Sequence, residues 1–226
     1  MKKVTIYGER CSGTNYLEEL LLLNFNVEIT WKYGWKHFFG FIDFIDFIEL
    51  NHTDDVLFIG IVRNIYDWIN SFYREQHHLP NHLTKNIDTF LTHTFYSIDC
   101  NGNEIMTDRN METNEMYKNI FELRSVKNKF LIKKMPTLVK NYCIITHDDL
   151  LTNFIDIMNK LKDCGLEIKN DIEFPLNITY YKNNKNIEFK KKVNEISNEI
   201  IDKIIKEDKE LLFYENLLFP KLKIET

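Results

Sequence analysis

The sequence predicts an α/β fold: a single three-layer domain, residues 1–226, in which a central and mainly parallel β-sheet is flanked by helices. Three observations lead to this prediction. Short apolar stretches alternate along the chain with stretches of helical periodicity. One of them, VLFIGIV at residues 56–62, is apolar throughout, as in strands that a parallel sheet buries on both faces. The hydrophobic content of 44% is enough for a large core, and 226 residues fit one domain better than two.

The first predicted unit is a strand, a tight turn and a helix. Residues 3–7 alternate as a strand does, and residues 14–23 carry tyrosine and leucine side chains at helical spacing. A second strand is predicted at residues 27–30. The turn after the first strand is therefore a strand-to-helix connection, which is a common place for anion binding.

The second predicted unit begins with the buried strand at residues 56–62, which ends at Arg63. A helix is predicted from about residue 66 to residue 74. Asn64 and Asp67 have side chains suited to accepting hydrogen bonds from the first amides of that helix. Arg63 is thus expected between the end of a buried strand and the start of a helix.

The rest of the chain continues the alternation of helices and strands. The remaining predicted elements are a short helix at residues 87–95, an exposed loop at 101–110, a long helix at 112–135 ended by Pro136, a third buried strand at 141–146, an amphipathic helix at 148–164 stopped at Gly165, a polar loop at 177–186 and a final helix at 189–208. Parallel strands place their carboxyl ends at one edge of the sheet, where α/β proteins bind ligands.

Composition and charge exclude several classes of protein. The net charge of −5 gives no general attraction to nucleic acid or to an anionic membrane, so we expect no nucleic-acid partner. The four cysteines form no C-x-x-C pair, which argues against a zinc ribbon or a disulfide framework and favours a reducing compartment. No stretch reaches about 18 uncharged apolar residues, and the chain starts with a strand instead of a signal peptide. We therefore expect a soluble, cytoplasmic protein without a transmembrane segment; its oligomeric state is not predicted.

The first turn, GERCSGTNYL at residues 8–17, resembles a phosphate-binding loop that lacks the parts needed for ATP. Gly8 and Gly13 have the spacing of the loop G-x-x-x-x-G-K-[ST], but Thr14 and Asn15 stand where that loop has its lysine and its magnesium-binding hydroxyl. The unpaired first amides of a helix, together with the helix dipole, hold an anion without a metal. The residues predicted to bind the anion here are Arg10, Cys11, Ser12, Gly13, Thr14, Asn15 and Tyr16.

A second anion-binding point is predicted at Arg63, because the strand before it ends at the same edge of the sheet as the first turn. Ser71 follows eight residues later, about two turns into the next helix, and its hydroxyl is a candidate for the same anion. Two phosphate-binding points suggest a nucleotide with phosphates at both its 5′ and 3′ positions.

These stretches resemble the sulfotransferase family. GERCSGTNYL is similar to the 5′-phosphosulfate loop of that family, commonly P-K-S-G-T-T-W, and IVRNIYDWINSFY is similar to its 3′-phosphate motif, in which a serine follows an arginine after eight residues. NYCIITHDDLL resembles the family's strand and acidic turn, often R-Y-E-D-L, and ELLFYENLLF resembles its closing segment. The resemblance covers the chain to about residue 151.

The resemblance implies a P-loop nucleotide-hydrolase-like sulfotransferase fold and a metal-independent enzyme. Such an enzyme transfers a sulfuryl group from 3′-phosphoadenosine 5′-phosphosulfate (PAPS) to a hydroxyl or amine and releases adenosine 3′,5′-bisphosphate (PAP). It also implies that Lys182, in the loop before the final helix, closes over the 3′-phosphate; a solvated loop at that place is an equal alternative.

The sequence departs from the family where Cys11 replaces the lysine that contacts the bridging oxygen of the donor. Arg10 or Lys36 is therefore expected to stabilise the charge on the leaving group. His37, in the aromatic and basic stretch WKYGWKHFF, is the candidate catalytic base, with Glu9 as the alternative. A packing role among the aromatic rings is the competing interpretation of Lys36 and His37.

The acceptor is not identified by the sequence. Residues 38–50 and 76–110 are expected to form its wall, and their aromatic side chains suit a sugar, a phenol or an alcohol. Two alternative functions remain open: a divergent P-loop nucleotide or small-molecule kinase, and a non-catalytic nucleotide-binding module with the same fold. Magnesium-dependent ATP turnover would identify the kinase, and nucleotide binding without transfer would identify the module.

Overall fold

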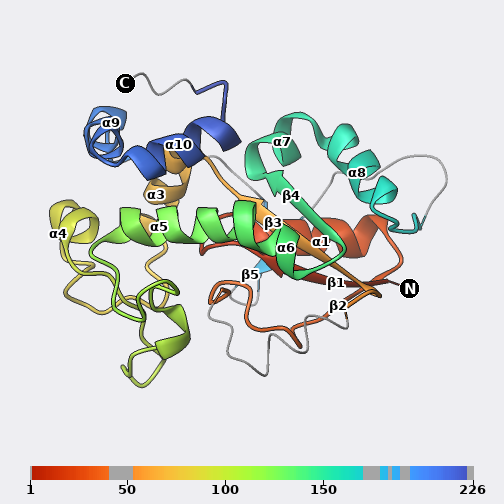
Figure 1. Ribbon diagram of the computed structural model, residues 1–226, viewed down its shortest axis with the longest axis horizontal. Coiled ribbons are helices and arrows are strands. Elements are labelled where there is room, and N and C mark those ends of the chain that lie inside the picture. The colour runs from red at the N-terminus through yellow and green to blue at the C-terminus, as the bar shows by residue number, and fades with distance from the viewer. Residues whose placement is uncertain (1, 41–52, 170–178, 183–184, 189–193, 223–226) are drawn as a thin grey trace.

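The computed structural model describes residues 2–40, 53–169, 179–182, 185–188 and 194–222 (Figure 1). For residues 179–182 and 185–188 it describes only the backbone. The described residues form an α/β domain with a four-stranded parallel sheet flanked by helices. The fold class is as expected.

The sheet has the strand order β2-β1-β3-β4, and all neighbouring strands are parallel. Its strands are β1 (Lys2–Tyr7), β2 (Val27–Ile29), β3 (Val56–Val62) and β4 (Tyr142–Thr146). Every residue of β3 is buried, which explains why that strand is apolar throughout. Each predicted strand is confirmed to within one residue at either end.

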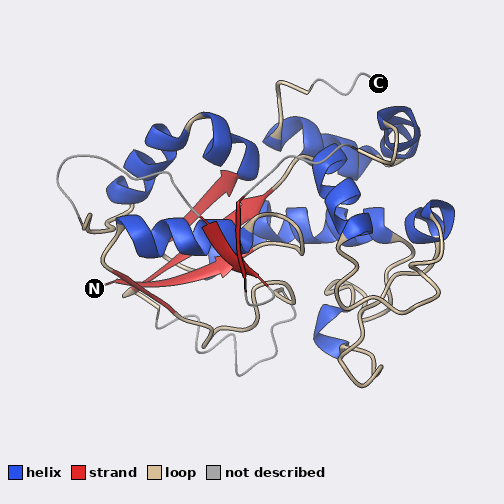
Figure 2. Ribbon diagram, turned by 180° about the vertical axis from the view of Figure 1, so that it is seen from behind, coloured by secondary structure: helices blue, strands red, loops and turns tan. Residues whose placement is uncertain are grey.

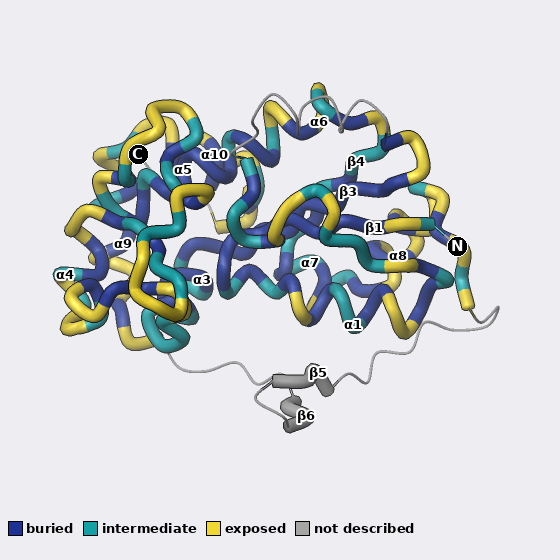
Figure 3. The backbone as a smooth tube through the Cα atoms, turned by 90° about the horizontal axis from the view of Figure 1, so that it is seen from below, coloured by how far each residue is buried: buried dark blue, intermediate teal, exposed yellow. Residues whose placement is uncertain are grey.

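Helices cover both faces of the sheet, as Figure 3 shows from below. One face packs against α1 (Thr14–Asn24), α7 (His147–Thr152) and α8 (Phe154–Asp163). The other face packs against the π-helical segment η2 (Phe130–Lys134) and the short helix α6 (Met135–Leu138). The two helical layers and the sheet give the three expected layers.

A further group of helices lies beyond the carboxyl ends of the strands, on the left of Figure 1. The helices of this group pack around one large cluster of buried apolar side chains. They are α3 (Ile65–Arg74), α4 (Ile87–Thr92), α5 (Ile120–Lys129), α9 (Asn198–Glu207) and α10 (Lys209–Leu218). The 3-10 turn η1 (Met106–Asp108) lies in the predicted loop at residues 101–110. The polar loop predicted at residues 177–186 is wrong, because β5 (Thr179–Lys182) and β6 (Lys185–Glu188) pair there as antiparallel strands. Figure 2 shows these elements from behind.

The predicted long helix at residues 112–135 is wrong in both bounds. Helix α5 begins only after Asn119, whose side chain accepts hydrogen bonds from the amides of Phe121 and Glu122. The helix then continues through η2 into α6, past Pro136. Proline is tolerated there because it stands in the first turn of α6, where its missing N–H has no required partner.

Three other predicted helices are also corrected. The helix predicted at residues 87–95 ends at Thr92, and Phe95 forms a β-bridge with Tyr117. The helix at residues 148–164 is divided into α7 and α8 at Asn153, whose backbone is not helical. Of the final helix predicted at residues 189–208, residues 194–197 are not helical and α9 begins at Asn198; residues 189–193 lie outside the described part of the chain. No helix in the described ranges is long and apolar enough to cross a membrane.

Candidate functional site

A cavity of about 420 Å³ lies at the carboxyl edge of the sheet, where the first turn meets the start of α3. Most of the predicted site residues line it: Arg10, Cys11, Gly13, Thr14, Asn15, Tyr16, Lys36, His37, Arg63 and Ser71. Ser12 is buried and is not among the lining residues. Lys182 ends β5, and its side chain lies outside the described part of the structure. The sequence therefore predicted side chains that the fold brings together.

The first turn is a tight loop against a histidine. Gly13 has a φ of 94°, in the left-handed region, and a Cβ atom there would lie 2.4 Å from Cδ2 of His147. Cys11 also has a left-handed φ of 63°, and the Ser12 amide donates to the Glu9 carbonyl at 3.0 Å. Helix α1 starts at Thr14, so its unpaired first amides belong to the turn that borders the cavity.

Arg63 is a buried cation on the α3 side of the cavity, which Arg74 also lines. Its Nη1 donates to the carbonyl oxygen of Cys11 at 3.2 Å, which joins the end of β3 to the first turn. The Nε atom is buried and has no hydrogen-bond partner. Burial lowers the pKa of the guanidinium, and the carboxylate of Asp67 opposes that shift. A buried cation with an unused donor is a favourable partner for an anion.

Ser71 borders the same cavity from α3. Its side chain is hydrogen-bonded to the thiol of Cys11, and burial raises the pKa of that thiol to about 11. Cys11 is therefore a neutral thiol near pH 7, and it supplies neither a positive charge nor a reactive thiolate. Arg63 and Ser71, eight residues apart in sequence, meet the turn from the same side.

Lys36 is the cation at the opposite side of the turn. Its Nζ contacts Oδ1 of Asn15 and lies 3.5 Å from Oε2 of Glu18. The ammonium also lies 5.2 Å from the ring centre of Trp31 and 5.5 Å from that of Trp35. Burial lowers the pKa of Lys36, while the charge of Glu18 raises it.

His37 follows Lys36 and presents a defined tautomer. Its Nδ1 lies 2.8 Å from the carbonyl oxygen of Gly8. Because a carbonyl oxygen only accepts hydrogen bonds, Nδ1 carries the proton and Nε2 keeps its lone pair. Burial lowers the pKa of His37 to about 3, so the ring is neutral near pH 7. A neutral imidazole with an available Nε2 is the form that a general base requires.

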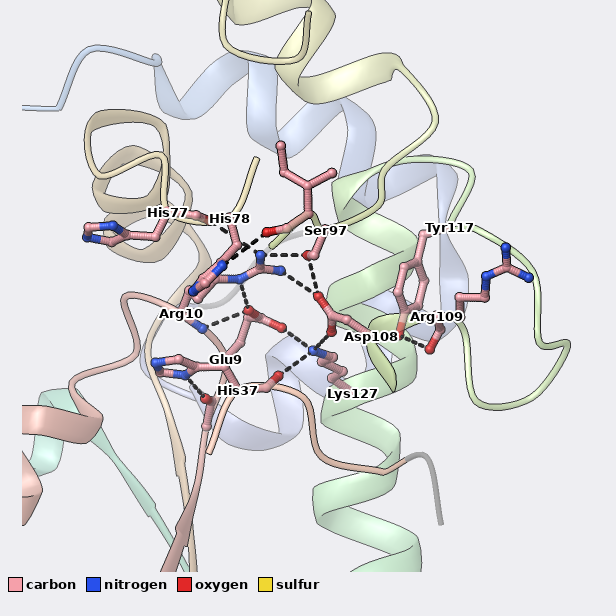
Figure 4. A network of polar contacts seen from close by, with 12 residues as sticks. Glu9, Arg10, His37, His77, His78, Ser97, Asp108, Arg109, Tyr117 and Lys127 are labelled. Atoms are coloured by element: carbon pink, nitrogen blue, oxygen red, sulfur yellow. Dashed lines mark hydrogen bonds and ion pairs between the residues drawn. The ribbon is translucent and has the colours of Figure 1, made fainter. Parts of the chain in front are cut away.

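Arg10 and Glu9 belong to a buried ionic network, shown in Figure 4. Arg10 pairs with Glu9 at 2.7 Å and with Asp108 at 2.9 Å, and it donates to Oγ of Ser97 at 2.7 Å. Although Arg10 contributes to the lining of the cavity, its guanidinium is held by these partners. The expected contact of Arg10 with a leaving group is therefore not favoured by the geometry, and Lys36 is the better candidate.

Glu9 is held in the same network. Burial alone would raise the pKa of its carboxyl group, but the charges of Lys127 and Arg10 overcome burial and lower that pKa to about 2. Both carboxylate oxygens accept hydrogen bonds, Oε1 from Arg10 and Oε2 from Lys127. Glu9 thus acts as a structural carboxylate, and His37 remains the candidate base.

Several residues at the site were not singled out from the sequence. His147 is buried, contacts Gly13 and meets the ring of Tyr16 edge-on, with 6.2 Å between ring centres. Its place directly after a predicted strand was a usable signal, because parallel strands end at the binding edge. Asp108 and Lys127 gave no such signal.

His77 and His78, within the predicted acceptor wall at residues 76–110, also line the cavity. Residues 41–52, which make up most of the other predicted wall segment, lie outside the described residues. Among the residues that the structure describes, no group of three or more His, Cys, Asp or Glu side chains is arranged to hold a metal ion.

No family model matches the sequence, and a search of curated proteins finds no significant match.

Proposed function

We propose that the protein transfers a sulfuryl group from PAPS to a hydroxyl or amine acceptor. The observation that carries the proposal is the buried guanidinium of Arg63, which has an unused Nε donor and joins the first turn through the Cys11 carbonyl. One cavity thereby offers two places for anionic groups, the start of α1 and the Arg63 side chain.

The donor fits this arrangement as follows. The first amides of α1 and the side chains of Thr14 and Asn15, which line the cavity, hold the 5′-phosphosulfate. Arg63 and Ser71 hold the 3′-phosphate, whose negative charge offsets the cost of burying the guanidinium. Tyr16 borders the cavity next to these groups and belongs to the same nucleotide site.

The transfer step uses His37 and Lys36. Nε2 of His37 takes the proton from the acceptor as the acceptor oxygen or nitrogen forms a bond to sulfur, and the bond from sulfur to the bridging oxygen of the donor breaks. PAP leaves with both electrons of that bond. The Lys36 ammonium, which contacts the Asn15 side chain in the first turn, stabilises the negative charge that develops on the leaving phosphate.

A second candidate is a nucleotide-binding module without transfer activity. It is favoured by the neutral Cys11 thiol and by the engagement of Arg10 with Glu9 and Asp108, which together leave the turn itself without a free cation among its described side chains. This candidate shares the nucleotide site and differs only in whether Lys36 and His37 perform chemistry.

Thermal unfolding with PAP or with magnesium-ADP tests the nucleotide site. At about 100 times Kd, PAP stabilises the folded state by about 2.7 kcal/mol, or by about 5–10 °C for a chain of this size. Arg63→Ala abolishes most of this shift. Arg109→Ala is the matched control, because Arg109 pairs with Glu104 at 2.7 Å and does not line the cavity.

The proposal fails if magnesium-ADP stabilises the protein more than PAP does, which is the result expected of a kinase. It also fails if Arg63→Ala binds PAP as the unaltered protein does. Transfer of labelled sulfate from PAPS to a panel of sugars, phenols and alcohols then separates the enzyme from the non-catalytic module.

A further inference from the structure

Lys127, on α5, uses all its donor capacity inside the protein. Its ammonium donates to Oε2 of Glu9 at 2.6 Å, to the backbone carbonyl of His37 at 2.6 Å and to Oδ1 of Asp108 (Figure 4). An ammonium has three donors, so these acceptors account for all of them. One of the acceptors belongs to the candidate base.

The network around Lys127 is buried and balanced in charge. Arg10 pairs with the same two carboxylates through their other oxygens, at 2.7 Å to Glu9 and 2.9 Å to Asp108. Two cations and two anions therefore cancel, and the four side chains are 0–8% exposed. Such a network is stable only when complete, because a charge left without a partner in the interior is costly.

His37 is held at two points that this network connects. Lys127 fixes its backbone carbonyl, and the Gly8 carbonyl fixes Nδ1 of its ring. Gly8 directly precedes Glu9, which Lys127 also holds. Lys127 thus holds the backbone of His37 and the residue next to the acceptor of its ring, while the Gly8 amide itself donates to the Lys36 carbonyl at 3.0 Å.

We propose that Lys127 is a positioning residue for His37, with Asp108 as the counter-ion that holds the Lys127 ammonium in place. By fixing the His37 backbone against the first turn, Lys127 keeps Nδ1 hydrogen-bonded to Gly8 and leaves Nε2 available as the base. The inference rests on the proposed function only in treating His37 as the base.

The imidazole tautomer reports this positioning directly. In the protein the ring carries its proton on Nδ1, whereas an unconstrained histidine side chain favours the proton on Nε2. A change that merely weakens the fold would leave the tautomer of the folded protein unaltered. A change that releases His37 from Gly8 shifts it toward the Nε2–H form.

The test compares the single variant Lys127→Met with the charge-balanced pair Lys127→Met/Asp108→Asn. Thermal unfolding gives stability, and the ring ¹⁵N shifts of histidine-labelled protein at pH 7 give the tautomer, with His37→Gln identifying the signal of His37. Lys129→Met is the matched control, since Lys129 lies on the same helix and pairs with Glu112 and Glu210 instead.

In the paired variant, stability recovers relative to Lys127→Met, because one cation and one anion are removed together. The tautomer ratio of His37 nevertheless shifts by about tenfold toward Nε2–H, as the loss of one hydrogen bond would produce. Lys129→Met keeps the original tautomer. If the paired variant recovers stability and His37 still carries its proton only on Nδ1, Lys127 is purely structural and the proposal is overturned.

Lys127→Arg provides a second variant if the paired variant does not fold. It keeps the positive charge for Glu9 and Asp108, but the planar guanidinium is not expected to reach the His37 carbonyl as well. The same tautomer shift supports the proposal, and an unchanged tautomer overturns it. These measurements need no donor or acceptor, so they decide the role of Lys127 even if the protein fails to bind PAP.

Discussion

The chemistry of individual residues at the cavity follows from burial. Burial lowers the pKa of Arg63, of Lys36 and of His37, because each charged form loses contact with water. Arg63 and Lys36 keep their charge, and the free-energy cost of burying that charge favours an anionic ligand beside them. For His37 the consequence differs, because the lowered pKa keeps the ring neutral near pH 7 and also makes it a weaker proton acceptor than an unburied histidine.

His37 and Glu9 predict how stability depends on pH. His37 has a pKa of about 3 in the folded protein and 6.5 as its ordinary value, so the unfolded chain binds more protons between these values. The contribution of His37 to the free energy of unfolding is present above about pH 6.5 and is lost as the pH falls toward 3. Glu9, whose pKa is lowered from 4.5 to about 2, adds a further loss below about pH 4.5.

Urea unfolding of the unaltered protein and of His37→Gln between pH 7.5 and pH 4.5 measures this effect. We expect the free energy of unfolding of the unaltered protein to fall toward acid pH, and to fall less steeply in the variant, because the variant lacks the depressed imidazole. Parallel pH curves for the two proteins would show that His37 does not have the low pKa.

At the residue scale, the sequence was most informative where a side chain directly follows a strand. Arg63 was found because the end of a buried strand fixes its place in the fold. The partners of Arg10 could not be found in the same way, because Asp108 is 98 residues away and lies in what looked like an exposed loop. A buried ion pair between distant residues leaves no local pattern in the sequence.

At the scale of elements, the first turn depends on Gly13, which lies against His147 at the start of α7. Gly13 has a left-handed φ of 94° and lies against His147. Gly34 has a φ of 103°, and a Cβ atom at that position would have no other atom within 4 Å. Alanine at either position incurs the strain of a left-handed backbone, about 1–2 kcal/mol. Only at Gly13 does it also displace a ring that lines the cavity.

We therefore expect Gly34→Ala to lower the free energy of unfolding by about 1–2 kcal/mol and to bind PAP normally. Gly13→Ala is expected to lose more stability and most of its PAP affinity. Chemical unfolding and PAP titration of the two variants check this. Equal PAP affinity in both would show that the close contact between the turn and His147 is not needed for binding.

The prediction of elements succeeded for the four strands of the parallel sheet, missed β5 and β6, which were predicted as a polar loop, and was less accurate for helices. A buried strand is recognised by its apolar run, as at β3, and its length is limited by the sheet. Helix ends depend on caps and on tertiary contacts instead. Asn119 starts α5 by accepting from two amides, and the chain passes through a π-helical segment to a proline that it tolerates.

At the scale of the whole molecule, the cavity lies where the sheet edge meets the group of helices beyond it. Arg124 on α5 ties these parts together, since it donates to the Arg63 carbonyl at 2.7 Å and pairs with Glu215 of α10 at 2.6 Å. The position of Arg63 is therefore supported from the last helix of the described chain. These two contacts join residues that are 61 and 91 positions apart in the chain, and contacts over such separations could not be predicted from the sequence.

In the proposed function, the cavity binds a nucleotide with a 5′ and a 3′ phosphate without a metal. Calorimetric titration of the intact protein with PAP and with adenosine 5′-monophosphate, both in EDTA, tests it most directly. Charge-assisted hydrogen bonds from Arg63 to the 3′-phosphate should make PAP bind about ten to a hundred times more tightly. Equal affinity for the two nucleotides, or PAP binding that appears only when magnesium is added, would contradict the account.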